Sequence, residues 1–144
     1  MTTDAPRGPA SSAGSSGPVE LPGPEVRMAR MVFPDQTNHM GTLFGGQALS
    51  MMDEACFVAA SRLARKTCVT VQVDRIDFTV PVHAGELVEV VARVASIGRT
   101  SLTCEVELYA ENLLSGERRR ATAGRFVLVA VDANGRPTPV VPES

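Results

Sequence analysis

The chain has 144 residues and a formal net charge of −2, with acidic and basic side chains scattered along its length. This length suits one domain, and the charge pattern argues against general affinity for nucleic acid, which requires clustered Lys and Arg. The only basic cluster, residues 118–120, lies at a predicted strand start, where we interpret it as a solvated edge. No apolar run is long enough to cross a bilayer, so we expect no membrane insertion.

Residues 1–23 differ in composition from the rest of the chain. Most are Gly, Pro, Ser or Ala, and Val19 and Leu21 are the only large aliphatic residues after the initiator. Such a segment buries too little apolar surface to offset its chain entropy, so we predict a disordered tail. It also lacks the basic and apolar regions of a secretory signal. The folded domain is therefore expected over residues 24–140.

The next segments predict a short strand, a loop and a long helix. The strand covers residues 25–33 and ends at Pro34, and a polar loop follows over residues 35–41. Residues 47–65 are rich in Ala, Leu and Met and contain no Pro or Gly, which favours a helix. Most of its positions are apolar, and a narrow polar stripe lies near its start (Gln47, Ser50, Asp53 and Glu54). A helix this apolar over most of its circumference should be buried among other elements.

Four long strands are predicted after the helix. In residues 66–78, Val69, Val71 and Val73 alternate on one face, but the apolar parity then flips, which predicts a bulge. The other strands are expected over residues 86–97, 102–110 and 119–131, separated by turn sequences. No helix separates these strands, so the sheet should be antiparallel and the fold class α+β. One antiparallel sheet curling around a single helix satisfies this order.

Cysteine and histidine usage argues against metal or redox chemistry. The three cysteines, Cys56, Cys68 and Cys104, lie far apart among apolar neighbours, without a Cys-x-x-Cys pair. We therefore expect reduced core cysteines in a cytoplasmic protein. His39 and His83 have no potential metal-ligand partners at useful spacing, so we predict no metal site.

The join between loop and helix carries the strongest chemical signal. Gly45 and Gly46 remove side chains where the helix begins, which leaves first-turn N–H groups open to close approach. A helix N-terminus carries partial positive charge and suits an oxygen that becomes anionic during reaction. Asp53 follows two turns later among apolar neighbours, where a poorly solvated carboxylate would suit a base or nucleophile. The alternative is an ordinary helix start with an exposed carboxylate.

Residues 33–55 resemble the signature of the hotdog-fold acyl-CoA thioesterases. That signature reads Pro-x-x-x-Asn-x-x-Gly-x-x-Phe-Gly-Gly and leads into a helix bearing Met-Asp-Glu, as residues 34–46 and 52–54 do here. The resemblance continues through residues 73–78, 81–86 and 94–101. It implies a hotdog fold, in which an antiparallel sheet wraps one long central helix.

The resemblance also implies an acyl-CoA thioesterase activity and roles for individual residues. Asp53 matches the catalytic aspartate, which either activates water or attacks the thioester carbonyl. The backbone N–H groups of Gly46 and Gln47 would polarise that carbonyl, and Asn38 could orient the water. Thr42 departs from the pattern, because some relatives carry Asn or Asp there, and its hydroxyl could at most hold a water.

The resemblance further implies a substrate and an assembly. CoA enters as part of the substrate, and no separate cofactor is expected. Arg99, Thr100 and Ser101 form a turn that could bind CoA phosphates, and Arg75 could do the same or pair with an acidic neighbour. We expect a homodimer or a trimer of dimers. Two alternatives stay open: a hydratase or dehydratase of acyl thioesters, for which only His39 lies in the right region, and a non-catalytic acyl-CoA-binding module.

Overall fold

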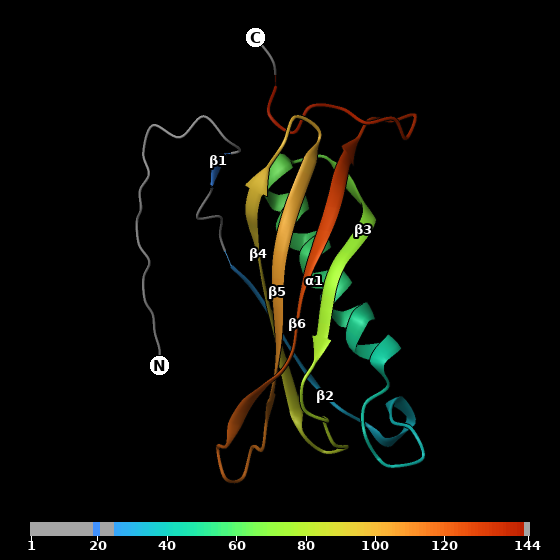
Figure 1. The fold of residues 1–144 in the computed structure, drawn as a ribbon, viewed down its shortest axis with the longest axis vertical. Coiled ribbons are helices and arrows are strands. Elements are labelled where there is room, and N and C mark those ends of the chain that lie inside the picture. Colours follow the sequence, from blue (N-terminus) through green and yellow to red (C-terminus); the bar gives the residue numbers. More distant parts are fainter. Residues whose placement is uncertain (1–18, 21–24, 143–144) are drawn as a thin grey trace.

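The protein folds as one antiparallel sheet packed against one long helix (Figure 1). The computed structural model describes residues 19–20 and 25–142. Its elements in chain order are β1 (Val19–Glu20), β2 (Val26–Met31), a 3-10 helix (Pro34–Gln36), α1 (Gly45–Ala64), β3 (Thr67–Phe78), β4 (Leu87–Ile97), β5 (Ser101–Glu111) and β6 (Arg118–Val131). The strands pair in the order β1-β4-β5-β6-β3, and β2 also pairs with β4. The α+β class and the packing of a single long helix against one antiparallel sheet are confirmed.

Helix α1 supplies one side of the core. Its buried face is built from small and flexible apolar side chains (Ala48, Met51, Met52, Ala55, Cys56, Ala59, Ala60 and Ala64). The helix ends at Ala64: the N–H of the C-cap residue Arg65 donates to the Ser61 carbonyl, and its left-handed φ of 54° then turns the chain out of the helix. Burial around most of the circumference is wrong for the single chain, because the sheet covers only one face and Phe57 stays 46% exposed.

Strands β4 and β5 show the alternation that the sequence predicts. In β5 every second residue is buried, so Leu102, Cys104, Val106, Leu108 and Ala110 point at the helix. The intervening residues lie on the outer face of the sheet, as the period of two requires. All three cysteines are free and buried, as expected.

Strand β3 contains the predicted irregularity. Its pairing with β6 shifts register between Thr70 and Gln72 and again between Val73 and Arg75. Residues directly opposite each other point to the same face, so Val73 faces the helix with Phe126, whereas Val69 opposes Val129 on the outer face. The prediction that Val69, Val71 and Val73 share one face is therefore wrong, because the first bulge falls within that run.

The two edges of the sheet differ in whether a further strand pairs with them. Beyond β4, the edge is covered by β2 along residues 87–92 and by β1 at residues 96–97. At the other end, within the described residues, β3 pairs only with β6. Val19–Glu20 form a short strand, although the sequence predicts them to be part of a disordered tail. The other residues of that predicted tail, 1–18 and 21–23, lie outside the described residues. In the part of the chain that is described, no helix is long and apolar enough to span a membrane.

Candidate active site

The loop before α1 is organised by the Asn38 side chain. Its Oδ1 accepts hydrogen bonds from the Met40 N–H at 2.9 Å, the Thr42 N–H at 3.2 Å and the Thr42 hydroxyl at 3.1 Å. Gly41, with a φ of 76°, supplies the left-handed residue that this tight loop requires. The structure therefore brings the predicted residues Asn38 and Thr42 together, and the carbonyl end of Asn38 is occupied by its own loop.

The first turn of α1 contains an open backbone donor. The N–H of Gln47 donates to the Phe44 carbonyl at 3.0 Å, and the N–H of Ala48 donates to the same oxygen at 3.1 Å. No acceptor for the Gly46 N–H is found within the described residues. A Cβ built on Gly46 would meet nothing within 4 Å, so the surface above this residue is open. Of the two predicted donors, Gly46 is therefore available, and the Gln47 N–H is already engaged.

Asp53 is held by a residue that the sequence did not single out. The hydroxyl of Thr70 on β3 donates to Asp53 Oδ1 at 2.6 Å, and Asp53 is half-buried. The bond leaves Oδ2 without a partner among the described residues. Thr70 was missed because a threonine in a strand usually marks a solvated position, and only the register shift that follows it shows which face it occupies.

Gly46 and Asp53 do not meet within one chain. They are seven residues apart on the same helix, which corresponds to about 10 Å along its axis. A carbonyl group needs the oxyanion donor within about 3 Å of its oxygen and the attacking atom within about 3.5 Å of its carbon. The two groups of a single chain are therefore too far apart to act on the same carbonyl.

A mostly apolar pocket lies beside the start of α1. Its volume is about 220 Å³, and it is bounded by the end of β3 and the following turn (residues 78–82), together with Leu43, Ala48 and Thr122. The Phe78 ring lies about 3.5 Å from where a Cβ on Gly45 would be, which is ordinary van der Waals contact, so the ring packs against the helix start. The pocket lining thus joins the end of β3 to the start of α1.

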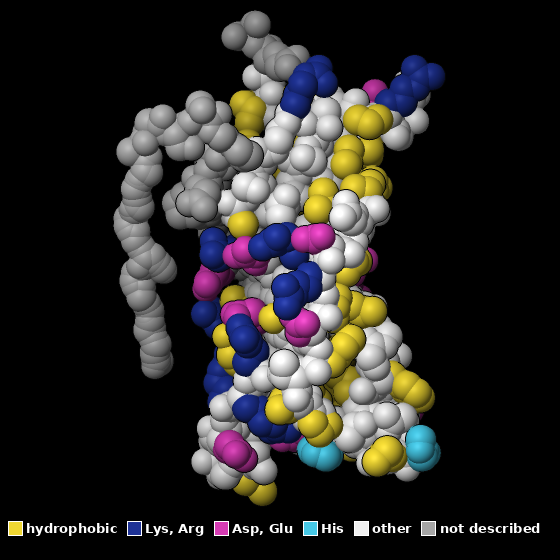
Figure 2. Space-filling view, viewed as in Figure 1, with side chains coloured by type: hydrophobic (Ala, Val, Ile, Leu, Met, Phe, Trp, Pro, Cys, Tyr) yellow, Lys and Arg dark blue, Asp and Glu magenta, His cyan; other side chains and the backbone are white. Residues whose placement is uncertain are grey.

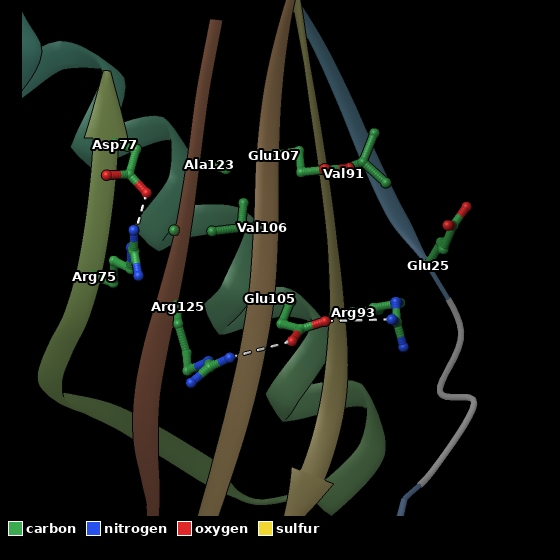
Figure 3. A pocket seen from close by; sticks show the side chains of 11 residues that line it. Glu25, Arg75, Asp77, Val91, Arg93, Glu105, Val106, Glu107, Ala123 and Arg125 are labelled. Carbon is green, nitrogen blue, oxygen red and sulfur yellow. Dashed lines mark hydrogen bonds and ion pairs between the residues drawn. The ribbon is translucent and has the colours of Figure 1, made fainter. Parts of the chain in front are cut away.

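The residues suggested for CoA phosphates lie away from this region. Arg75 is on the outer face, where its Nε donates to Asp77 Oδ2 at 2.9 Å (Figure 3). That face holds a depression of about 310 Å³ whose charged side chains all take part in ion pairs, including Arg93 and Arg125 on Glu105. The turn with Arg99, Thr100 and Ser101 joins β4 to β5, about 30 Å along β4 from the loop before α1. Within one chain, the turn therefore lies far from the loop before α1, and Arg75 lies on the opposite face of the sheet from Asp53.

The histidines and cysteines supply no competing site. Within the described residues, neither histidine side chain bonds a carboxylate, and no group of three His, Cys, Asp or Glu residues could hold a metal. The Cys56 thiol lies beside Cys104, and a hydrogen bond to that residue together with burial raises the pKa of Cys56 well above its ordinary value. Cys56 is therefore unsuited to act as a thiolate nucleophile.

Comparison with known proteins identifies the family. The Thioesterase superfamily model matches residues 40–116, and the chain belongs to this family. The uncharacterized acyl-CoA thioester hydrolase YkhA of Bacillus subtilis is 37% identical over 116 residues, which cover 78% of this chain and 67% of the relative. This confirms the resemblance that the loop and helix motifs indicated.

Solved structures confirm the hotdog fold. A hexameric acyl-CoA thioesterase in its apo form has a TM-score of 0.79 at 36% identity, covering 83% of this chain and 79% of its own. The acyl-CoA hydrolase of Staphylococcus aureus, solved with butyryl-CoA and CoA, has a TM-score of 0.77 at 30% identity, covering 83% and 75%. Variants of that enzyme carry alanine in place of an aspartate, a threonine or an asparagine.

Proposed function

We propose that this protein hydrolyses acyl-CoA thioesters to a carboxylic acid and free CoA, with Asp53 as the central catalytic carboxylate. The observation that carries this proposal is the Asp53–Thr70 hydrogen bond, which fixes a half-buried carboxylate on an apolar helix beside an open sheet edge. The relatives named as acyl-CoA thioester hydrolases support the reaction. The residue types replaced in the Staphylococcus aureus variants match Asn38, Asp53 and Thr70 here.

Two chemical routes use Asp53. In the first, the carboxylate takes a proton from water while the water oxygen attacks the carbonyl carbon, the C–S bond breaks, and the proton passes to the CoA sulfur. In the second, a carboxylate oxygen attacks the carbonyl and expels CoA, and water then hydrolyses the mixed anhydride. Both routes consume one water. A single turnover in heavy-oxygen water separates them, because only the anhydride route can place label in Asp53.

The reacting carbonyl is polarised by the N–H of Gly46 from a second copy of the chain. This assignment is supported by the separation of about 10 Å between Gly46 and Asp53 along one helix. Two antiparallel helices that overlap only along their first halves at a subunit seam would place the N-terminus of one beside the middle of the other. Asn38 and Thr42, which precede that N-terminus, would enter the same shared site and hold the attacking water.

The dimer seam is the free edge of β3. This strand is twelve residues long, and its exposed apolar side chains include Val69, Val71 and Phe78, at 43%, 57% and 54%. Apolar side chains gather along this edge and the neighbouring helix (Figure 2). A long apolar edge with unpaired backbone groups is a template for pairing with another strand, so a second β3 is its natural partner. The hexameric relatives support further assembly into a trimer of dimers.

The substrate would span this seam. The 220 Å³ pocket beside Phe78 suits the acyl chain, because it is mostly apolar and opens beside the helix start. The CoA phosphates would be bound by Arg75 or by the turn with Arg99, Thr100 and Ser101, from whichever subunit brings them near. The free, buried cysteines suit a reducing compartment, and we propose a cytoplasmic location.

The proposal is tested with a panel of acyl-CoA substrates and a thiol reagent that detects released CoA. We expect saturable release with at least one acyl chain, and a matched acyl-oxygen ester of similar shape serves as the control for nonspecific esterase activity. Enoyl-CoA substrates are assayed in parallel for hydration. Hydration without hydrolysis would favour the hydratase, and tight CoA binding without turnover on any substrate would favour the binding module.

A further inference from the structure

Arg119 on β6 clamps the turn between β3 and β4 at both of its ends. Its guanidinium donates to both carboxylate oxygens of Glu86, each at 2.8 Å, and to the Pro81 carbonyl at 2.9 Å. Glu86 Oε1 also accepts the backbone N–H of His83 at 2.8 Å, in the middle of the turn. Gly85, with a φ of 88°, allows the chain to reverse there. One arginine therefore ties both ends of the 81–86 turn to β6, in addition to the backbone bonds of Gly85 and Glu86 with Val32.

This pair is more enclosed than the other arginine pairs of the same strand. The side chains of Arg119 and Glu86 are only 27% and 13% exposed. The adjacent Arg120 forms a pair with Glu107 at the same distance of 2.8 Å, but there the exposures are 54% and 38%. In the basic cluster at residues 118–120, Arg119 thus differs from the solvated edge that the sequence indicated. Two parallel hydrogen bonds in a partly desolvated place fix geometry more firmly than an exposed pair does.

The 81–86 turn is hydrogen-bonded to the loop before α1. The Leu43 N–H donates to the Val82 carbonyl at 2.7 Å, and the Ala84 N–H donates to the Gly41 carbonyl at 3.2 Å. Between these bonds, Thr42 and His83 form an isolated antiparallel bridge. Phe44, the N-cap of α1, follows immediately. The contacts run without interruption from Arg119 through the turn and the loop to the helix start at Gly46.

We propose that Glu86 and Arg119 are positioning residues for thioester hydrolysis, which hold the 81–86 turn so that the loop before α1 keeps its place. Neither residue touches the reacting atoms. The proposal rests on the proposed function for its catalytic consequence, because the loop carries Asn38, Thr42 and the first N–H groups of the helix. A displacement of about 1 Å at such donors can cost about 100-fold in rate.

Backbone hydrogen exchange tests the positioning without any assay of turnover. The test variant is Arg119→Met, which keeps much of the side-chain length and removes the guanidinium group. The matched control is Arg120→Met on the same strand. We expect faster exchange in the peptide covering residues 37–44 for Arg119→Met alone, with the helix and β5 unchanged. Equal protection of that peptide in wild type and both variants would overturn the proposal.

Kinetics tests the catalytic consequence in the same folded samples. We expect kcat to fall about 10-fold to 100-fold in Arg119→Met with KM changed less than about threefold, since the oxyanion donor acts mainly in the transition state. Arg119→Lys should recover only part of kcat, because Lys supplies charge without the bidentate fork. If Arg120→Met lowers kcat as much as Arg119→Met, the specific role is excluded.

A milder variant covers the case in which Arg119→Met does not fold. Glu86→Gln keeps an oxygen that can accept from His83 and removes the charge, and it should show the same pattern at smaller amplitude. Normal exchange and normal kcat in Glu86→Gln would overturn the proposal. If exchange rises in residues 37–44 but the wild type hydrolyses no acyl-CoA, the anchoring holds and the proposed function fails.

Discussion

Removal of the Thr70 hydroxyl should weaken catalysis without disturbing the fold. Thr70→Val keeps the β-branched shape that suits a strand and deletes only the group that donates to Asp53 Oδ1 at 2.6 Å. Hydrogen bonds to charged groups contribute roughly 1.5–3 kcal/mol, and about 1.4 kcal/mol corresponds to a factor of ten in rate. Since Thr70 is exposed and Asp53 only half-buried in the single chain, we expect the lower part of this range, a loss in kcat of about tenfold.

The assay is CoA release under saturating acyl-CoA, with kcat and KM determined separately for each variant. Thr70→Ser should retain most of the activity, because it keeps the donor. Thr67→Val makes the same change three residues earlier in β3, where no side-chain hydrogen bond is formed within the described residues, and it should match wild type. A Thr70→Val protein with native circular dichroism and kcat within twofold of wild type would refute the role of this hydrogen bond.

Three further outcomes follow from the fold. Val71→Lys places a charge on the free β3 edge, so sedimentation should show smaller species and activity should fall with them; an unchanged assembly would contradict the β3 seam. The hydrogen bonds from the Arg119 guanidinium, together with the one from the His83 N–H, lower the pKa of Glu86. The ionised Glu86 therefore stabilises the fold fully above the ordinary glutamate pKa of about 4.3, and this stabilisation is lost as the pH falls through the lower pKa of the folded state. The difference in Tm between wild type and Arg119→Met should therefore be constant above about pH 5 and shrink in more acidic buffers, and a difference independent of pH down to acid unfolding would contradict it. Gly124→Ala would place a Cβ 3.0 Å from the Arg75 carbonyl oxygen and 2.3 Å from Ile76 Cδ1, so the free energy of unfolding in urea should fall by about 1–3 kcal/mol, and an unchanged midpoint would show that the strand backbone adjusts freely.

Local patterns in the sequence were sufficient to predict the helix and the strands of the fold. The alternation in residues 102–110 and the long Ala-, Leu- and Met-rich stretch are properties of the chain alone, and β5 and α1 form where they predict. The parity flip in residues 66–78 likewise located a real register shift. Its consequence for Val69 and Val73 could not be derived, because the face of each residue depends on where the bulge falls.

The candidate site was only partly predictable, because its geometry depends on contacts distant in sequence. Asp53 and Gly46 were found from their spacing on one helix. Thr70 was not, because its bond to Asp53 joins residues 17 apart through a bulged strand. The engagement of the Gln47 N–H by Phe44 depends on how the first turn closes. The ion pair between Arg119 and Glu86 joins residues 33 apart, so it could be predicted only if the register of β6 were known.

The most direct test of the account is the kcat/KM of Asp53→Asn. The amide has the same shape as the carboxylate and can accept the Thr70 hydrogen bond, but it can neither take a proton from water nor attack a carbonyl. We expect kcat/KM to fall by about 100-fold to 10,000-fold while CoA binding and the sedimentation profile stay at wild-type values. A folded Asp53→Asn protein that hydrolyses acyl-CoA within tenfold of the wild-type rate would contradict the central role of this carboxylate.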